Sequence, residues 1–462
     1  MLGPQLVTII ADRGSQTLVS SGWHVIANES RPLHCFYQLM NSIRNRRYNK
    51  IYEQLLLSRP FAVALGWVFT VALPSLFYWG FAIFSYPSDG QVWGIITSTI
   101  ALLLAYIGVI RLLSTYPGGQ SMGIIVPQVI IVYAICALIP LVLRVEVSRY
   151  LLLISGAAAI VWFQIEFLLT QRFRRPKLAI INLGTAQDLL AVPGINAREL
   201  IKPDLEGVRY DAVVADFDCL TPEWERFLTR CALDRIAVYN VRSVYESVTG
   251  RVRINRMSEN DIGSLLPSSF YERGKALCDW LLILVSLPIT VPLVAITAIL
   301  VKLESPGPVL YTQERMGLGN RPFKIYKIRS MRFDRDAPTQ FAGEADPRIT
   351  RVGKVIRKYR IDELPQFLNI LKGEMSLIGP RPEQPDFVAH FDEKLPFYTY
   401  RHVVKPGITG WAQVRHGYAA NLDQTREKIE HDFYYIKHCS FFLDFYILIL
   451  TIKTLCTGFG SR

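Results

Sequence analysis

The chain has 462 residues, of which 50% are hydrophobic and 19% are charged, and its mean hydropathy is +0.23. The length predicts two or three folded units. The composition excludes intrinsic disorder, which needs few apolar residues, and argues against a purely soluble protein. The net charge of +12 suits nucleic acid, an anionic membrane face or phosphorylated substrates. None of the seven cysteines forms a Cys-x-x-Cys pair or a zinc spacing, so reduced thiols are expected.

Four apolar stretches are long enough to cross a bilayer, which takes roughly 20 residues. They cover residues 61–84, 93–113, 122–143 and 150–170, and their short connections predict a four-helix membrane bundle over 61–170. Lys and Arg gather before the first stretch and after the fourth, whereas the connection 85–92 has neither. Both ends of the bundle are therefore expected on the cytoplasmic side, with 1–60 as a cytoplasmic segment that lacks the pattern of a cleaved signal peptide.

Residues 171–266 have the composition of a soluble α/β module. Apolar runs at 178–183, 211–216 and 235–241 are typical of buried parallel strands, and 222–233 has a helical pattern. Gly184 follows the first run as in a dinucleotide-binding turn, but G-T-A-Q-D is not G-x-G-x-x-G. We therefore expect a cytoplasmic Rossmann-like module with a structural or interaction role rather than a nucleotide site.

A further hydrophobic run covers residues 277–303 and has Ser286, Pro288 and Pro292 in its middle. Proline lacks an N–H and clashes with the preceding turn, so this helix should bend sharply. Basic residues flank both ends, which is compatible with a helix that dips into one leaflet and returns. A fifth, kinked span is the alternative and would place the C-terminal half outside; the basic character of that half favours re-entry.

The pair Asp362–Glu363 opens an apparent helix that ends at Lys372–Gly373, with Pro365 in its first turn. The N–H groups and positive dipole end of a helix attract phosphate. The same field should lower the pKa of Asp362, which would stay ionised and able to attack phosphorus. Glu363 would hold a divalent cation, most plausibly magnesium, which takes one or two carboxylates plus phosphate oxygens. A helix cap is the simpler interpretation of such a pair.

Cationic side chains elsewhere in this half could neutralise a transferring phosphoryl group, and Lys327, Arg357 and Arg381 are the candidates. Five histidines between 390 and 438 show no metal-ligand spacing and are expected to be packing or surface residues. The apolar stretch 441–455 contains Asp444 and Lys453, which predicts a helix on the bilayer surface rather than another span.

From about residue 270 to its end the chain resembles the bacterial polyprenyl-phosphate phosphoglycosyl transferases of the monotopic superfamily. The matching motifs are T-Q-E-R, F-K-I-Y-K-I-R-S-M, R-I-D-E-L-P-Q-F-L-N-I-L-K-G-E-M-S-L-I-G-P-R-P and K-P-G-I-T-G-W-A-Q-V. The bundle and the α/β module resemble the long hexose-1-phosphate transferase subgroup. The resemblance implies a mostly α catalytic domain over 267–462, anchored by a re-entrant helix at 277–303.

The chemistry of the family is implied for the matching residues. Asp362 would be the nucleophile that forms a phosphosugar-enzyme intermediate, and Glu363 beside it would help bind Mg²⁺. Arg357, Arg381 and Lys327 match phosphate-binding positions of the family. The helix break of the family, commonly Ser-Pro, falls on Val291–Pro292, so the proline is present and the serine is not.

The implied reaction transfers a hexose 1-phosphate from a UDP-sugar to undecaprenyl phosphate and releases UMP. It is the first membrane step of exopolysaccharide, capsule or O-antigen synthesis, in the bacterial inner membrane with the catalytic domain on the cytoplasmic side. Membrane lipid is an expected partner and a homodimer is expected. An inactive membrane scaffold of a polysaccharide complex is the alternative; a nucleic-acid partner is not expected, because no binding module is recognisable.

Overall fold

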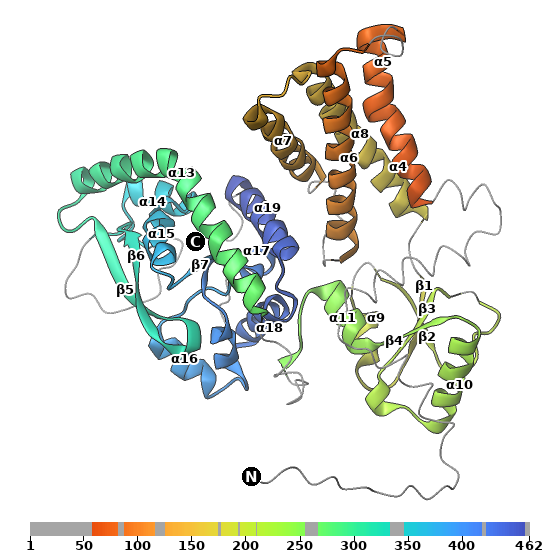
Figure 1. The fold of residues 1–462 in the computed structure, drawn as a ribbon. Helices are drawn as coiled ribbons and strands as arrows, with labels where there is room; N and C mark the ends of the chain where they lie inside the picture. Colours follow the sequence, from red (N-terminus) through yellow and green to blue (C-terminus); the bar gives the residue numbers. More distant parts are fainter. Residues whose placement is uncertain are drawn as a thin grey trace, which may run out of the picture.

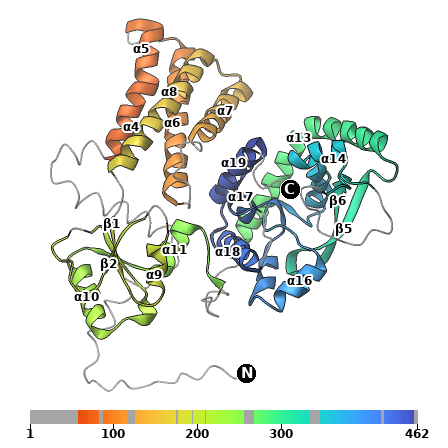
Figure 2. The ribbon, with the colours of Figure 1, turned by 180° about the vertical axis from the view of Figure 1, so that it is seen from behind.

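The computed structural model describes residues 58–81, 87–115, 125–173, 177–192, 195–208, 210–254, 267–332, 346–417 and 422–457. Almost all of the predicted N-terminal segment 1–60 lies outside these residues. The described chain is mostly helical, and Figures 1 and 2 show three parts: a helical bundle, an α/β module and a C-terminal part beside them.

The bundle consists of α4 (Arg59–Trp67), the π-helix η1 (Val68–Ala72), α5 (Leu73–Trp79), α6 (Asp89–Thr115), α7 (Ile125–Leu143) and α8 (Arg149–Phe173). All four predicted stretches are helical and are long and apolar enough to cross a membrane, with α4, η1 and α5 together forming the first. Val71, Leu102, Val129 and Phe163 form the buried centre. Many large apolar side chains on the outside are exposed, as expected where lipid surrounds a bundle.

The α/β module has four parallel strands in the order β2-β1-β3-β4. They are β1 (Lys177–Ile181), β2 (Asn196–Leu200), β3 (Ala212–Ala215) and β4 (Ala237–Asn240), with helices α9 (Gln187–Leu190), α10 (Pro222–Leu233) and α11 (Val241–Thr249). Three of the strands and α10 were predicted. The edge strand β2 was missed because most of its side chains are exposed and it has no apolar run.

The turn after β1 is closed by a carboxylate. Gly184 has φ +58°, and a Cβ there would lie 2.5 Å from Asp216 Oδ2. The same oxygen accepts hydrogen bonds from the backbone N–H and the hydroxyl of Thr185, at 3.0 and 2.7 Å. Asp216 therefore accepts from the Thr185 N–H at the start of this turn, where a dinucleotide-binding loop would receive a pyrophosphate.

Helix α13 (Ser269–Glu304) runs unbroken through Pro288 and Pro292 and is a fifth helix long and apolar enough to cross a membrane. Figure 1 shows two limbs that meet at a bend near its middle, as the prolines predict. The hydroxyls of Ser286 and Thr290 donate to the carbonyls of Ile283 and Ser286, at 2.8 and 3.1 Å. These two side chains bond the backbone beside the bend, where Val291 replaces the serine of the family.

The C-terminal part surrounds two small sheets with short helices. The antiparallel hairpin is β5 (Leu310–Met316) and β6 (Pro322–Ile328), and β7 (Ser376–Ile378) pairs in parallel with β8 (Gly407–Thr409). The helices are α14 (Arg351–Lys358), the 3₁₀-helix η8 (Ile361–Gln366), α15 (Phe367–Leu371), α16 (Pro385–Asp392), the 3₁₀-helix η9 (Tyr398–Val403), α17 (Trp411–Arg415), α18 (Leu422–His438) and α19 (Phe441–Thr457). The strands were not predicted from the sequence.

The prediction of a surface helix at 441–455 was wrong. Leu443, Tyr446 and Ile447 of α19 are fully buried in the same hydrophobic cluster as Trp411 and Phe433. Asp444 is buried as well and accepts hydrogen bonds from Tyr271 and Tyr435, at 2.6 and 2.9 Å. The Asp444 carboxylate is therefore part of an internal hydrogen-bond network, and α19 is a core helix of the C-terminal part.

Candidate active site

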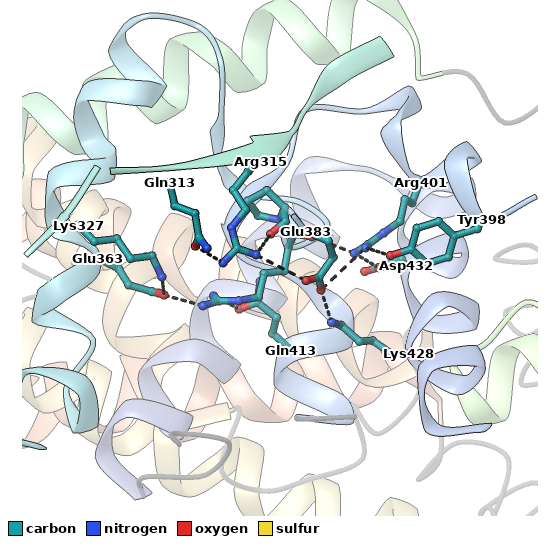
Figure 3. Close-up of polar contacts among 12 residues, drawn as sticks. Gln313, Arg315, Lys327, Glu363, Glu383, Tyr398, Arg401, Gln413, Lys428 and Asp432 are labelled. Carbon is teal, nitrogen blue, oxygen red and sulfur yellow. Dashed lines mark hydrogen bonds and ion pairs between the residues drawn. The ribbon is translucent and has the colours of Figure 1, made fainter. Parts of the chain in front are cut away.

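A buried carboxylate, that of Glu363, lies at the centre of the candidate site. Its side chain is 6% exposed, and its Oε1 lies 2.8 Å from Lys327 Nζ and 2.7 Å from Arg381 Nη2. The guanidinium of Arg360 approaches the other oxygen, with Nη1 3.8 Å from Oε2. The structure thus brings together Glu363, Lys327 and Arg381, which the sequence had proposed separately, and Figure 3 draws the contact between Lys327 and Glu363.

Three elements bring these side chains together: β6 carries Lys327, η8 carries Glu363, and the loop after β7 carries Arg381. Asn369 of α15 is fully buried; its Oδ1 accepts from the Tyr326 N–H at 3.2 Å and its Nδ2 donates to the Lys324 carbonyl at 2.7 Å. This amide ties η8 and α15 to strand β6 and so places Lys327 beside Glu363. Just before η8, Arg360 has the left-handed conformation (φ +53°), which is uncommon for a non-glycine residue and is found at functional sites.

Asp362 is partly exposed and forms no hydrogen bond or ion pair with the part of the chain that the structure describes. Burial and, second, the neighbouring charge of Glu363 raise its pKa to about 6, against the opposing effects of Lys327, Arg381 and Arg357. The expectation that the helix start lowers this pKa was wrong, because the adjacent carboxylate and partial burial outweigh the favourable charges. Asp362 is thus the less acidic member of the pair.

The pKa of Glu363 shifts in the opposite direction. Burial alone would raise it, but Arg381 and then Lys327 outweigh burial and hold it well below its usual range. The pKa of Arg381 is raised, above all by Glu363. Glu363 is therefore the carboxylate of the pair that stays ionised, whereas Asp362 next to it forms no ion pair with the described residues.

Arg357 lies in the last turn of α14, near enough to Asp362 to lower the pKa of that carboxyl. The start of α14 is fixed by Glu304, the last residue of α13, whose carboxylate accepts from the N–H groups of Arg351 and Val352 at 2.7 and 2.9 Å. The field of the helix N-terminus favours this negative charge. Arg357 is therefore positioned through the end of the membrane-directed helix.

A second polar network contacts the backbone of the P-R-P segment at residues 380–382, and Figure 3 draws its members Arg315, Glu383, Arg401, Lys428 and Asp432. Arg401 Nη2 donates to the Arg381 carbonyl at 2.9 Å and to Asp432 at 2.7 Å. Arg315 Nη1 donates to the Pro382 carbonyl at 3.2 Å. Both guanidiniums face Glu383, which lies 3.7 Å from Arg315 and 4.0 Å from Arg401. The P-R-P segment is thus fixed through its backbone, which leaves the side chain of Arg381 to reach Glu363.

The sequence reasoning missed several members of the site: Arg360, Gln413, and the supporting residues Arg315, Glu383 and Arg401. Gln413 Oε1 accepts from Arg360 Nη1 at 3.3 Å and from Arg381 Nη1 at 3.5 Å. Except for Arg401, these residues lie in or next to the motifs that carry the resemblance. Their roles depend on contacts between segments that lie 20 to 67 residues apart, which a motif alone does not specify.

The donor set fits a magnesium ion that shares its coordination with a substrate. Glu363 Oε2 is buried and accepts no hydrogen bond from the described residues, and a cation bound there would share this oxygen with the Arg360 guanidinium, whose Nη1 lies 3.8 Å away. The described residues hold no group of three or more His, Cys, Asp or Glu that could bind a metal by itself. Two carboxylates completed by phosphate oxygens are a common Mg²⁺ arrangement.

The network behind Arg381 predicts an acid-sensitive contribution to stability. Burial alone would raise the pKa of Glu383, but Lys428, which donates to it at 2.6 Å, and then Arg401 outweigh burial and lower that pKa from 4.5 to about 2. A depressed folded-state pKa gives stability that is present above pH 4.5 and is lost as the pH falls towards 2. Glu383→Gln should therefore destabilise the protein at pH 7 by roughly 3 kcal/mol.

The measurement is the thermal unfolding midpoint of purified wild type and Glu383→Gln between pH 7 and pH 3. The difference between the two midpoints should shrink below pH 4.5. Glu393→Gln, at an exposed position of the same half, is the matched control and should follow wild type throughout. A difference between wild type and Glu383→Gln that stays constant over this range would contradict the ion-pair assignment.

Comparison with known proteins assigns the family. Residues 270–458 match the family model described as "Bacterial sugar transferase". Over 420 residues, which are 90% of this chain and 99% of the relative, the chain is 49% identical to UDP-N-acetylgalactosamine-undecaprenyl-phosphate N-acetylgalactosaminephosphotransferase of Aeromonas hydrophila.

Other relatives match a smaller share of this chain. The chain is 42% identical over 193 residues to UDP-glucose:undecaprenyl-phosphate glucose-1-phosphate transferase of Xanthomonas campestris pv. campestris, which is 41% of this chain and 40% of the relative. It is 41% identical over 164 residues to the protein of the same name of Escherichia coli K12, 35% of each chain. The match to the Aeromonas relative extends over nearly the whole of both chains and so includes the bundle and the α/β module. Because of this match, the chain belongs to the bacterial sugar transferase family.

Proposed function

We propose that this protein transfers N-acetylhexosamine 1-phosphate from a UDP-sugar to undecaprenyl phosphate, through a covalent intermediate on Asp362. The observation that carries the proposal is the pairing of an unbonded, partly exposed Asp362 with a buried Glu363 that holds Lys327, Arg381 and Arg360 around it. The sugar class is supported by the name of the Aeromonas relative, which matches along nearly the full length of both chains.

In the first step an Asp362 oxygen attacks the phosphorus that bears the sugar. The new bond joins that oxygen to phosphorus, the bond from this phosphorus to the bridging oxygen breaks, and UMP leaves with the electron pair. In the second step an oxygen of the lipid phosphate attacks the same phosphorus and releases the Asp362 carboxylate. Covalent catalysis allows a soluble donor and a membrane-bound acceptor to visit one site in turn.

Lys327, Arg357, Arg360 and Arg381 supply the positive charge that such a transfer needs. The diphosphate donor is strongly anionic, and preformed cations stabilise charge on the transferring group without reorganisation. A magnesium ion held by Glu363 and Asp362 would neutralise phosphate oxygens of the donor. Glu363 contributes by keeping two of these cations, Lys327 and Arg381, in fixed positions before the donor arrives.

We further propose that α13 enters the membrane and returns to the same side. Its first limb packs through Ile283 against Ile325 and Ile370, and its second limb packs through Val301 against Ile328 and Ile356. Both limbs thus contact one compact body, so this body stays on one side of the membrane only if the helix does not cross. The outward face of the helix is apolar and exposed, including Leu284, Val285 and Ile289, and needs lipid cover.

Replacement of the nucleophile tests the reaction. Asp362→Asn should abolish both turnover and the phosphosugar adduct, because the amide is a poor nucleophile and a poor leaving group. The measurements are UMP release and intact-protein mass after incubation with donor alone. Asp423→Asn, on the exposed face of α18, should behave as wild type. Wild-type activity in Asp362→Asn would remove the nucleophile assignment.

The sugar class is tested with a panel of radiolabelled UDP-sugars, undecaprenyl phosphate and Mg²⁺. We expect labelled lipid from UDP-N-acetylgalactosamine at least tenfold faster than from UDP-glucose, because the relative named for N-acetylgalactosamine matches 90% of this chain, whereas the two relatives named for glucose match 41% and 35% of it. The readout is the initial rate of label transfer to the organic phase. Preference for UDP-glucose would overturn the sugar class and leave the reaction type standing.

Re-entry is tested by the location of the C-terminus. With four spans before it and a helix that returns, a tag after Arg462 should be cleaved by protease in inverted vesicles and protected in intact spheroplasts. A control tag in the connection between the first two spans, before Asp89, should show the opposite pattern. Cleavage of the C-terminal tag in spheroplasts would mean that α13 crosses the bilayer.

A further inference from the structure

The end of the α/β module is built into the core of the C-terminal part. Val252 and Ile254, which follow α11, are 6% and 1% exposed and belong to the same hydrophobic cluster as Trp411, Ile429 and Phe433. The Val252 N–H donates to the Glu430 carbonyl of α18 at 3.0 Å. The module is therefore joined to the catalytic part by a packed apolar contact as well as by the chain.

Charged pairs reinforce this contact. Glu246 of α11 is buried and lies 2.9 Å from Lys437 Nζ and 3.4 Å from His438 Nε2 of α18. Arg251 forms an ion pair with Glu427 of the same helix. Because partly buried ion pairs fix the relative orientation of two surfaces, the module and α18 hold one arrangement.

Helix α17 lies between this interface and the site. Trp411, its first residue, is 1% exposed and donates its indole N–H to the Gly250 carbonyl of the module at 2.9 Å. Two residues later Gln413, 7% exposed, accepts from Arg360 and Arg381. Residues at i and i+2 of a helix point in different directions, so α17 presents the indole to the module and the amide to the site.

Gln413 gives the two arginines beside Glu363 an acceptor other than that carboxylate. Arg360 and Arg381 both approach Glu363, with a guanidinium nitrogen 3.8 and 2.7 Å from a carboxylate oxygen. Gln413 Oε1 binds one nitrogen of each guanidinium and so holds the two groups at a fixed separation. Transferring a phosphoryl group depends on donors that are already aimed at the charge that develops.

We propose that Gln413 is a positioning residue for sugar-phosphate transfer, and that the α/β module holds it in place through the hydrogen bond of Trp411 to Gly250. The inference rests on the proposed function. It assigns the α/β module a part in catalysis. Gly250, directly after α11, sets the orientation of α17, and α17 in turn orients Arg360 and Arg381 through Gln413.

The first experiment uses the full-length enzyme in detergent, with UDP-N-acetylgalactosamine and undecaprenyl phosphate, and compares Gln413→Leu with Gln413→Glu. Leucine has a similar volume but no acceptor, and should lower kcat by about 10- to 100-fold with a change in donor KM below about threefold. Glutamate keeps an acceptor at the same place and should restore kcat to within about fivefold of wild type. The unfolding midpoint of Gln413→Leu should stay close to that of wild type.

The second experiment removes the link to the module. Trp411→Phe keeps a ring and loses the donor to Gly250, and should lower kcat by about 3- to 10-fold in the same direction as Gln413→Leu. Trp224→Phe, on α10 within the module and against Phe227, is the matched control and should leave kcat unchanged. The double variant Trp411→Phe, Gln413→Leu should be no slower than Gln413→Leu, because both changes act on one path.

Three results would overturn the inference. They are a wild-type kcat in Gln413→Leu, an equal loss in the leucine and glutamate variants accompanied by a lower unfolding midpoint, and a wild-type kcat in Trp411→Phe. Failure of the proposed function is distinguishable from these, because wild-type enzyme would then transfer no sugar phosphate at all.

Discussion

The arrangement of the site depends on one ionised carboxylate, that of Glu363, in a place where water scarcely reaches it. An unpaired charge there would cost several kcal/mol, so the fold is stable only with cations against it. Lys327 comes from a hairpin strand, Arg381 from the loop after β7 and Arg360 from the residue before η8, and all three converge on this carboxylate. Burial and, second, the same charge raise the pKa of the neighbouring Asp362. In the proposed reaction, the structural and the reactive role would fall to these two adjacent acids.

Local patterns in the sequence were sufficient to predict the long apolar helices and the strands that form continuous apolar runs. The four spans, three strands of the module, α10 and the bend of α13 follow from residue spacing and from Pro288 and Pro292. The helix at Asp362–Glu363 was also expected, although its first turns are 3₁₀. Strand β2 and helix α19 were not, since their environment depends on neighbours: β2 is a polar edge, and the Asp444 that suggested a surface helix is satisfied by Tyr271 and Tyr435.

The candidate residues of the site were identified through the family motifs, and the structure adds how they meet. No local pattern reveals that Gln413 accepts from Arg360, 53 positions earlier, or that Arg401 holds the backbone of Arg381. Such contacts depend on the parallel pairing of β7 with β8, directly after which a Cβ on Gly410 would lie 2.1 Å from the Gly379 carbonyl. Close backbone approach at glycine thus brings the P-R-P loop against α17. The direction of the Asp362 pKa shift was misjudged for the same reason, because burial and neighbouring charge are tertiary properties.

Helix α13 links the apolar and the charged halves of this bacterial sugar transferase. Its exposed side chains need hydrocarbon, while its last residue, Glu304, caps the helix that carries Arg357. A displacement of α13 relative to the membrane surface would therefore be transmitted to a cation beside Asp362. On the opposite side, α17 connects Arg360 and Arg381 to the α/β module through Gln413 and Trp411. The cations of the site are thus held by elements anchored outside it, and in the proposed reaction their geometry would be set before either substrate arrives.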